Sequence, residues 1–503
     1  MIRSIRYTLR FPSASQHYVD IEATFPGEAG GITLMLAVWT PGSYMLREYA
    51  RHLEGVRAAS FTGEALAVRK VAKNRWHVAC DGDGDVAVSY RVYGRELTVR
   101  NNWIERDFAM LNGAPTFLTR VGSERTPHDV TVELPATWKS VYTAMPKHPD
   151  GGPCHYRAED FDQLVDSPLL LGNAAAYPFE VGEKEHVLVN EGEGGVWDGP
   201  RSAADVAKLV QQNLKMWGAL PYPRYVFLNV LCDGRGGLEH KDSSVMMASR
   251  WATRTRSDYV DWLGLISHEF FHVWNIKRLR PEALGPFDYE REVPTRSLWV
   301  AEGLTAYYDD LNVHRAGLST QKEYLERLSK SIEQVQTTPG RRVQPLGDAS
   351  FDAWIKHYRR DENTDNTAIS YYIKGTVVGF LLDAKIRQAT GNKKCLDDVM
   401  RLAFSRYAGA RGYREEEFRA AAQEVAAAPL GSWFGTAVDS TEELDFTEAL
   451  AWYGLQFKKP EAAKADGEAP PNKAGWLGIS SRQEGGRLMV SEVVRDTPAY
   501  SAG

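Results

Sequence analysis

Residues 259–274 read YVDWLGLISHEFFHVW, and they contain an HExxH motif from His268 to His272. Apolar and aromatic residues flank the motif on both sides, which is typical of a helix buried in a protein core. Residues i and i+4 of a helix share one face, so both imidazoles can reach the same metal ion. Glu269 projects beside them, where it can meet a metal-bound water. The stretch therefore predicts a buried helix that binds a catalytic zinc ion through His268 and His272.

A catalytic zinc ion usually has three protein ligands, and the third has to come from outside this helix. Residues 298–310 read LWVAEGLTAYYDD and show a second helical pattern, with Glu302 among apolar neighbours. A glutamate in such surroundings is either a metal ligand or half of a buried ion pair. The metzincin pattern would need Gly and His soon after the second histidine, but VWNI follows at 273–276. We predict His268, His272 and Glu302 as ligands of one zinc ion, which is the gluzincin pattern.

The predicted zinc site implies hydrolysis by a metal-activated water. Zinc lowers the pKa of its bound water and polarises a scissile carbonyl. Glu269 is the predicted general base, which takes the proton of the water and later delivers it to the leaving amine. The oxyanion needs a further hydrogen-bond donor. The segment SYYIKG at 370–375 offers two tyrosines for this role, Tyr371 and Tyr372.

The ligand histidines need partners of their own, because a zinc-bound histidine usually donates its second ring N–H to a carboxylate or a carbonyl. Asp309 lies two turns after Glu302 on the same predicted helix face and is one candidate. Asn275, just after the HExxH motif, is another. The ligand set fits zinc, and cobalt or manganese would fit the same side chains.

A further carboxylate stands in the segment DGRGGLEH at 233–240. If Glu239 lies next to the metal, it selects the cationic amine of a peptide N-terminus and so enforces the removal of N-terminal residues. The alternative is an ordinary loop glutamate that follows a turn.

These motifs resemble the aminopeptidase N family, whose members combine HExxH, a downstream glutamate and a YxKG segment. The YxKG tyrosine of that family stabilises the transition state, and its position corresponds to Tyr372, with Tyr371 as the alternative. The family's GxMEN segment lies along the substrate, and its glutamate binds the free N-terminal ammonium. The resemblance therefore assigns Gly236, Gly237 and Glu239 to substrate binding, with His240 in place of the asparagine.

A closer resemblance is to the glycyl aminopeptidase family, a related branch of gluzincins found with a PDZ domain. It rests on WTPGSYMLREYARH at 39–52, on GGLEH at 236–240 and on FHVWNIKRLRP at 271–281, and it spans nearly the whole chain. The resemblance implies a thermolysin-like catalytic domain and the removal of N-terminal residues, with a preference for small ones such as glycine or alanine.

The hydrophobic pattern along the chain predicts a multidomain α+β protein. Residues 1–175 alternate with period two between frequent turn signals, which predicts an N-terminal antiparallel β-sandwich-like domain. Residues 176–458 are mainly helical and form the expected thermolysin-like zinc peptidase domain. Residues 459–474 are rich in small, charged and proline residues and predict a linker. Residues 475–503 resemble the start of a PDZ domain, and since they are too few to close a core, we expect a truncated chain.

Composition excludes several classes of protein. The net charge is −6 and no long basic run occurs, which argues against nucleic-acid binding. No apolar run reaches the roughly 18–20 residues that cross a bilayer. The N-terminus lacks an apolar signal segment, so we expect a cytoplasmic protein, or a periplasmic one if a signal was trimmed. The four cysteines form no CxxC pair, which indicates reduced thiols.

Three hypotheses about function remain from the sequence. The first is a zinc aminopeptidase that acts on peptides with a free N-terminus. The second is a thermolysin-like zinc endopeptidase, which shares every metal ligand; loss of Glu239 should harm an aminopeptidase strongly and an endopeptidase little. The third is a non-catalytic scaffold that binds peptides by strand addition through a complete PDZ domain, and the intact set of zinc-site residues argues against it.

Overall fold

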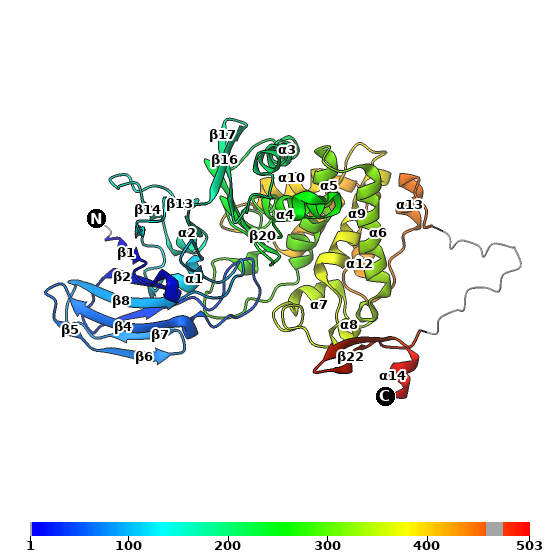
Figure 1. Ribbon diagram of the computed structural model, residues 1–503. Helices are drawn as coiled ribbons and strands as arrows, with labels where there is room; N and C mark the ends of the chain where they lie inside the picture. Colours follow the sequence, from blue (N-terminus) through cyan, green and yellow to red (C-terminus); the bar gives the residue numbers. More distant parts are fainter. Residues whose placement is uncertain (1–2, 459–475) are drawn as a thin grey trace, which may run out of the picture. The chain divides into compact units, whose positions relative to one another are not determined.

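The computed structural model describes residues 3–458 and 476–503 (Figure 1). The chain divides into two compact units. The first unit comprises Met1–Arg278, Leu284–Val293 and Asp309–Thr320, and the second comprises Leu279–Ala283, Pro294–Tyr308 and Gln321–Gly503. The predicted multidomain α+β fold is confirmed, since the N-terminal part is built of sheets and the later part of helices.

The N-terminal part of the first unit contains three sheets. The largest has the order β14-β12-β1-β2-β8-β4-β5, and two four-stranded sheets have the orders β13-β15-β10-β9 and β11-β3-β7-β6. The strands are β1 (Ile5–Arg10), β2 (Tyr18–Pro26), β3 (Ile32–Met35), β4 (Leu53–Ser60), β5 (Ala65–Leu66), β6 (Val68–Ala72), β7 (Arg75–Val78), β8 (Asp85–Tyr93), β9 (Trp103–Ile104), β10 (Ala109–Leu111), β11 (Thr119–Arg120), β12 (His128–Glu133), β13 (Ser140–Tyr142), β14 (His155–Ala158) and β15 (Leu169–Gly172). Short helices lie between them: η1 (Ala14–Gln16), η2 (Tyr49–His52), α1 (Gly113–Thr116) and α2 (Phe161–Val165).

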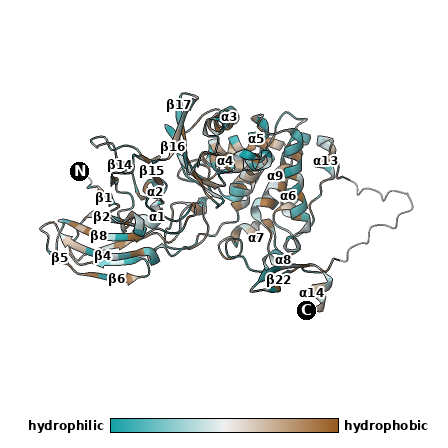
Figure 2. Ribbon diagram, viewed as in Figure 1, coloured by the Kyte–Doolittle hydropathy of each residue, from teal (hydrophilic) through white to brown (hydrophobic). Residues whose placement is uncertain are grey.

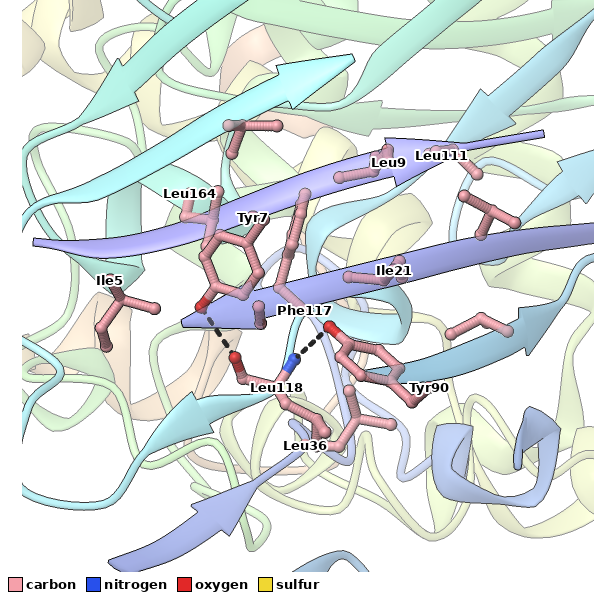
Figure 3. Close-up of a cluster of buried hydrophobic side chains, with 14 of the residues drawn as sticks. Ile5, Tyr7, Leu9, Ile21, Leu36, Tyr90, Leu111, Phe117, Leu118 and Leu164 are labelled. Carbon is pink, nitrogen blue, oxygen red and sulfur yellow. Dashed lines mark hydrogen bonds between the residues drawn. The ribbon is translucent and has the colours of Figure 1, made fainter. Parts of the chain in front are cut away.

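The period-two alternation in the sequence places one face of each long strand in a shared core. Along β1 and β2, buried side chains alternate with more exposed ones, and hydrophilic and hydrophobic colours mix along β4 and β8 (Figure 2). The core brings together side chains from all three sheets. Within it, the Tyr7 hydroxyl donates to the carbonyl of Leu118 at 2.7 Å, and the hydroxyl of Tyr90 accepts from the Leu118 N–H at 3.2 Å (Figure 3).

Strand pairing in these sheets is mainly antiparallel, but β1 pairs with β12 in parallel. A long stretch of chain separates these two strands, and side-chain alternation is the same for either direction of pairing. The sequence pattern therefore predicts the strands but not this partner.

A five-stranded sheet of order β16-β17-β18-β20-β19 completes the first unit. Its strands are β16 (Ala175–Val181), β17 (Lys184–Glu191), β18 (Arg224–Leu231), β19 (Gly236–Glu239) and β20 (Ser243–Ala248), and helices α3 (Gly199–Trp217) and α4 (Arg256–Phe271) pack on it, with η3 (Ala252–Arg254) before α4. The central strands β17, β18 and β20 run parallel, whereas β19 is antiparallel to β20 and forms the edge. Nearly every residue of β18 and β20 is buried, which is typical of parallel strands covered on both faces.

The second unit is mainly helical, and α9 lies at its centre. The helices along this part of the chain are η4 (Glu282–Leu284), the π-helical turn η5 (Trp299–Gly303), α5 (Leu304–Arg315), α6 (Gln321–Thr337), η6 (Pro339–Arg342), α7 (Leu346–Phe351), α8 (Thr364–Thr367), α9 (Tyr371–Ala389), α10 (Leu396–Tyr407), α11 (Glu415–Ala426), α12 (Gly431–Ala437) and α13 (Thr447–Tyr453). Helix α9 packs against η5, α6, α7, α10, α11 and α13. It is apolar around most of its circumference, as a central helix must be, and the Ser370 side chain caps its start by accepting from the Ile373 N–H.

The described C-terminal residues form a two-stranded hairpin of β21 (Ile479–Glu484) and β22 (Arg487–Val493), followed by α14 (Pro498–Ala502). The PDZ assignment of this segment stays a prediction, as do the domain boundaries at 175 and 458. The predicted linker at 459–474 lies outside the described residues. None of the helices within 3–458 and 476–503 has the length and apolar character that crossing a bilayer requires.

Candidate active site

The HExxH motif occupies the last turn of α4, in the first unit. The Thr255 side chain caps the start of this helix by accepting from the Asp258 N–H. His268 and His272 lie on one face, with ring centroids 4.7 Å apart and ring planes at 86°. Glu269 and His272 are buried, with 5% and 1% of their surface exposed. The predicted buried helix is therefore present, and its two histidines point to a common position.

Each of these histidines has a partner at Nδ1. His268 donates to Oδ2 of Asp309 across 3.2 Å, and His272 donates to the backbone carbonyl of Asn275 across 2.9 Å. Carboxylate and carbonyl oxygens only accept, so both rings carry their proton on Nδ1. This tautomer leaves the two Nε2 atoms as lone-pair donors, which is the form that binds zinc. The structure thus brings both predicted partners to the histidines, Asn275 through its main chain rather than its side chain.

A cluster of acidic groups lies beside His272. The carboxylates of Glu239 and Glu269 and a ring nitrogen of His272 lie within 4.8 Å of one another. Glu239 is 3% exposed, and its Oε1 has no hydrogen-bond partner among the described residues. Two carboxylates buried this close together are costly without a cation. The donor set of imidazole and carboxylate suits zinc, and the orphaned oxygen of Glu239 suits an ammonium group.

Strand β19 runs closely past Glu269. A Cβ added to Gly237 would lie 2.6 Å from Cγ of Glu269, so only glycine allows this approach. The strand is the edge of its sheet, and an edge strand offers unpaired main-chain groups to an extended peptide. Gly236, Gly237 and Glu239 therefore lie along an edge that can take a substrate main chain.

A tight turn from the N-terminal sheets supports Glu239 from the other side. The Ser43 N–H donates to the Thr40 carbonyl at 3.1 Å, and Gly42 has φ of +91°. Proline at the second position and a positive-φ glycine at the third are the signature of a type II turn. A Cβ on Gly42 would lie 2.6 Å from the carboxyl carbon of Glu239. The Pro-Gly-Ser-Tyr segment thus packs its backbone directly against the candidate amine-binding carboxylate.

The WNIKR extension after the HExxH motif anchors the end of β19 through Asp166. Oδ1 of Asp166 accepts from Nζ of Lys277 at 2.7 Å and contacts Nδ1 of His240 at 3.0 Å, and Oδ2 accepts from the Lys241 N–H at 2.7 Å. Burial disfavours the charged carboxyl, but Lys277 and His240 outweigh burial and hold the pKa of Asp166 well below its usual range. Arg278 adds a second tie, to Asp242, at 2.8 Å.

Asp166 is a residue of this site that sequence reasoning missed. It lies 74 positions before His240, at the end of α2, and no motif surrounds it. The only signal was Lys277, a charged residue next to an apolar run, which predicts some buried carboxylate partner without saying which one.

Glu302 belongs to the second unit, where it lies in the π-helical turn η5 and is 2% exposed. A π-turn inside a longer helix is rare and is frequently found at functional sites. The turn packs against the start of α9: a Cβ on Gly303 would lie 2.7 Å from Cα of Gly375 and from the carbonyl oxygen of Tyr371. Gly375 of the YIKG segment is therefore required, because a side chain at this position would keep the turn that carries Glu302 away from α9.

The two tyrosines of this segment differ in exposure. Tyr371 is fully buried, whereas Tyr372 keeps part of its surface accessible. Burial, reinforced by the charge of Glu302, raises the pKa of Tyr372 well above 10. The hydroxyls of Tyr358 and Tyr372 lie 3.2 Å apart, and the His357 ring packs on Tyr372 with centroids 5.4 Å apart. Tyr358 and His357 are further residues that the sequence did not indicate.

Two family models match the chain. The model described as the peptidase M61 N-terminal domain matches residues 6–173, and the model described as M61 glycyl aminopeptidase matches residues 261–378. The chain belongs to the M61 family of glycyl aminopeptidases. The M61 models cover both the β-rich N-terminal part and the segment that carries HExxH, Glu302 and Tyr372.

Solved structures agree with the M61 assignment. An aminopeptidase N family protein from Idiomarina loihiensis matches with a TM-score of 0.91 and 29% identity, over 99% of this chain and 87% of that one. An M1 zinc metallopeptidase variant from Deinococcus radiodurans, bound to a Tyr-Ser-Ala substrate, matches with a TM-score of 0.54 and 12% identity, over 88% of this chain and 95% of that one; this second likeness shows the fold. A search of curated proteins finds no match.

This M61 peptidase is therefore a zinc metallopeptidase of the aminopeptidase kind that acts on peptides, as the sequence predicted. The alternative of a non-catalytic scaffold is set aside.

Proposed function

We propose that this M61 peptidase removes small N-terminal residues, glycine and alanine first, from peptides with a free amino group, at a site with one zinc ion. The observation that carries the proposal is the buried carboxylate of Glu239. It lies on an edge strand, within 4.8 Å of Glu269 and His272, and its Oε1 lacks a partner among the described residues. A substrate ammonium would supply the missing donor and the missing positive charge.

His268, His272 and Glu302 are the proposed zinc ligands. The two histidines present Nε2, because Asp309 and Asn275 occupy Nδ1. Glu302 is the proposed third ligand because the chain connects it closely to Asp309, the partner of His268. The turn η5 leads directly into α5, and Asp309 follows Glu302 by seven residues. Seven residues are about two helical turns, so both side chains share one helix face. Zinc in this place supplies an acidified water and polarises the scissile carbonyl.

Glu269 is the proposed proton carrier. It adjoins the first ligand histidine on α4 and is buried next to the proposed amine site. Its carboxylate takes a proton from the attacking water and hands it to the leaving amine, which requires one side chain within reach of both. Gly237 leaves the room that this carboxylate occupies.

Tyr372 is the proposed oxyanion donor. Its raised pKa keeps the hydroxyl protonated at the pH of the reaction, so it donates a hydrogen bond to the developing negative charge instead of repelling it. Tyr358, at 3.2 Å from its hydroxyl, orients it. Tyr371 is fully buried and serves packing.

The preference for small first residues rests on the family and is supported by the crowding of Glu239. The Gly42 turn lies against one side of this carboxylate. An ammonium held by Glu239 therefore has its first side chain near a rigid turn, which favours glycine and alanine over branched or long side chains.

The test compares the hydrolysis of glycyl-, alanyl- and leucyl-p-nitroanilide with that of an N-acetylated glycyl substrate. We expect cleavage of the free amines only, with glycine and alanine fastest. Glu239→Gln should lose this discrimination along with most activity, whereas Glu302→Ala should lose bound zinc, as measured by metal analysis. Equal cleavage of the acetylated substrate would overturn the proposal and leave an endopeptidase. Zinc retained in full by Glu302→Ala would remove that residue from the ligand set.

The cytoplasmic location and the peptide binding of a complete PDZ domain stay predictions.

A further inference from the structure

A cavity of about 340 Å³ lies in the second unit, away from the face of α9 that carries Tyr372. Its walls come from α6, η6, the start of α9 and the loop before α13. Lys374 follows Tyr372 by two positions, and residues two apart on a helix point in directions about 200° apart. The volume is in the range of small-molecule sites, which starts at about 300 Å³.

Lys374, at the start of α9, lines this cavity. Its side chain is buried, with 1% of the residue exposed, and no hydrogen bond or ion pair joins its amine to another described residue. Burial lowers the pKa of its amine to about 8, although the charge of Glu443 opposes the shift. A buried ammonium without a partner is costly, and a cavity that holds one is suited to a ligand that brings an anionic group.

The charge of Glu443 acts on this lysine, but the same carboxylate is shared with two arginines. Glu443 is engaged by Arg341, whose Nε lies 3.1 Å from both carboxylate oxygens, and by Arg342 at 3.4 Å. Glu442 also lines the cavity, is exposed, and accepts from the Thr436 hydroxyl at 3.3 Å. The lining therefore combines the buried amine of Lys374, the exposed carboxylate of Glu442 and the apolar side chains of Val335, Leu444 and Phe446.

We propose that this cavity binds a free amino acid with an apolar side chain, its carboxylate on Lys374 and its ammonium facing Glu442. The apolar wall takes the side chain. Each end of the zwitterion meets a group of opposite charge, and the carboxylate gives the Lys374 ammonium a charge-assisted hydrogen bond. An aminopeptidase releases amino acids, so this cavity would sense the product of the reaction through α9, the helix that carries Tyr372. That role rests on the proposed function, whereas the binding of an amino acid does not.

The experiment measures acylation of Lys374 by acetic anhydride at pH 8.5, followed by peptide mass spectrometry. L-leucine is the probe, and the Glu239→Gln variant serves as the protein, so that occupancy of the proposed amine site does not interfere. Lys330, exposed on α6 and outside the cavity lining, is the internal control. We expect leucine to slow labelling of Lys374 at least fivefold and to leave Lys330 unchanged.

Analogues decide what is recognised. 4-Methylpentanoate, which lacks the ammonium, should protect more weakly than leucine, and 3-methylbutylamine, which lacks the carboxylate, should not protect. Protection by the amine, equal protection by inorganic phosphate, or no labelling of Lys374 without ligand would each overturn the proposal. In equilibrium binding with the same Glu239→Gln background, Lys374→Met should lose leucine affinity at least tenfold, and Lys330→Met should keep it. Unchanged affinity of Lys374→Met would also sink the idea.

Discussion

The surroundings of α4 and the surroundings of α9 are built by different physical means. Around α4, charged side chains hold one another: Asp309 fixes His268, and Asp166 fixes His240 and Lys277. Around the start of α9, close packing holds the side chains in place: Gly303 lies directly against Gly375, and the Tyr371 ring stacks on Tyr372. The proposed proton carrier, Glu269, belongs to the first of these surroundings, and the proposed hydrogen-bond donor, Tyr372, belongs to the second.

The largest expected effect comes from changing Glu269, in the charged surroundings of α4. Glu269→Gln removes the proton carrier and keeps the size of the side chain, so kcat should fall by roughly 10³-fold with little change in bound zinc. Steady-state kinetics and metal analysis on the same preparation check this. A variant that retained a tenth of the activity would remove Glu269 from its proposed role and weaken the contrast between the two regions.

The next largest effect is expected from the hydroxyl of Tyr372, in the closely packed surroundings of α9. Tyr372→Phe should lower kcat about 10²-fold with little change in KM, because the lost hydrogen bond forms mainly in the transition state. The matched control is Tyr371→Phe, which removes the neighbouring, fully buried hydroxyl and should keep most activity. Equal losses in both variants would show that the pair acts as a structural unit.

The raised pKa of Tyr372 gives a pH test of the same residue. The active form is the protonated one, and burial raises the pKa of this hydroxyl well above 10. We therefore expect kcat to depend on pH in the same way in the wild type and in Tyr372→Phe between pH 8 and 10. A wild-type decline in this window that the phenylalanine variant lacks would contradict the environment seen for the hydroxyl.

Substitution of Asp166 tests whether the ion pairs near α4 also stabilise the folded protein. Asp166→Asn leaves Lys277 buried without its counter-ion and should lower the free energy of unfolding by about 3 kcal/mol. Asp20→Asn, which loses a half-exposed partner of Arg91, is the control and should cost less than about 1 kcal/mol. Denaturant unfolding of the three proteins gives both values.

The pH dependence of the Asp166 effect has a definite sign. The folded-state pKa of this carboxyl is depressed, so its ion pairing stabilises the fold above the unfolded pKa of about 4 and is lost as pH falls below it. The difference between wild type and Asp166→Asn should therefore shrink in acid and stay constant between pH 6 and 8. A constant difference down to pH 3 would point to lost packing rather than lost charge.

The two regions also differ in how far the sequence revealed them. HExxH is a local pattern, since helix geometry alone brings positions i and i+4 together, and the apolar neighbours of Glu302 marked it as buried. Asp166 was invisible because its contact depends on how α2 lies against the end of β19, 74 residues away. The parallel pairing of β1 with β12 was hidden for the same reason. Motifs report chemistry carried by neighbours in the chain, whereas partners set by tertiary packing leave no local pattern.

The smallest expected effect tests packing on the charged side. Gly42→Ala puts a methyl group onto the carboxyl of Glu239 and should lower kcat/KM for glycyl substrates about tenfold, mostly through KM, by displacing the amine-binding group. Gly30→Ala is a close control, because Gly30 has φ of +92° against +91° for Gly42 and no atom within 4 Å of the added carbon. Both variants carry the same backbone strain, about 1–3 kcal/mol, so only the first should lose affinity for substrate. If both lost activity equally, strain in the N-terminal sheets would be the cause, and the turn at Thr40 to Ser43 would have no part in holding Glu239.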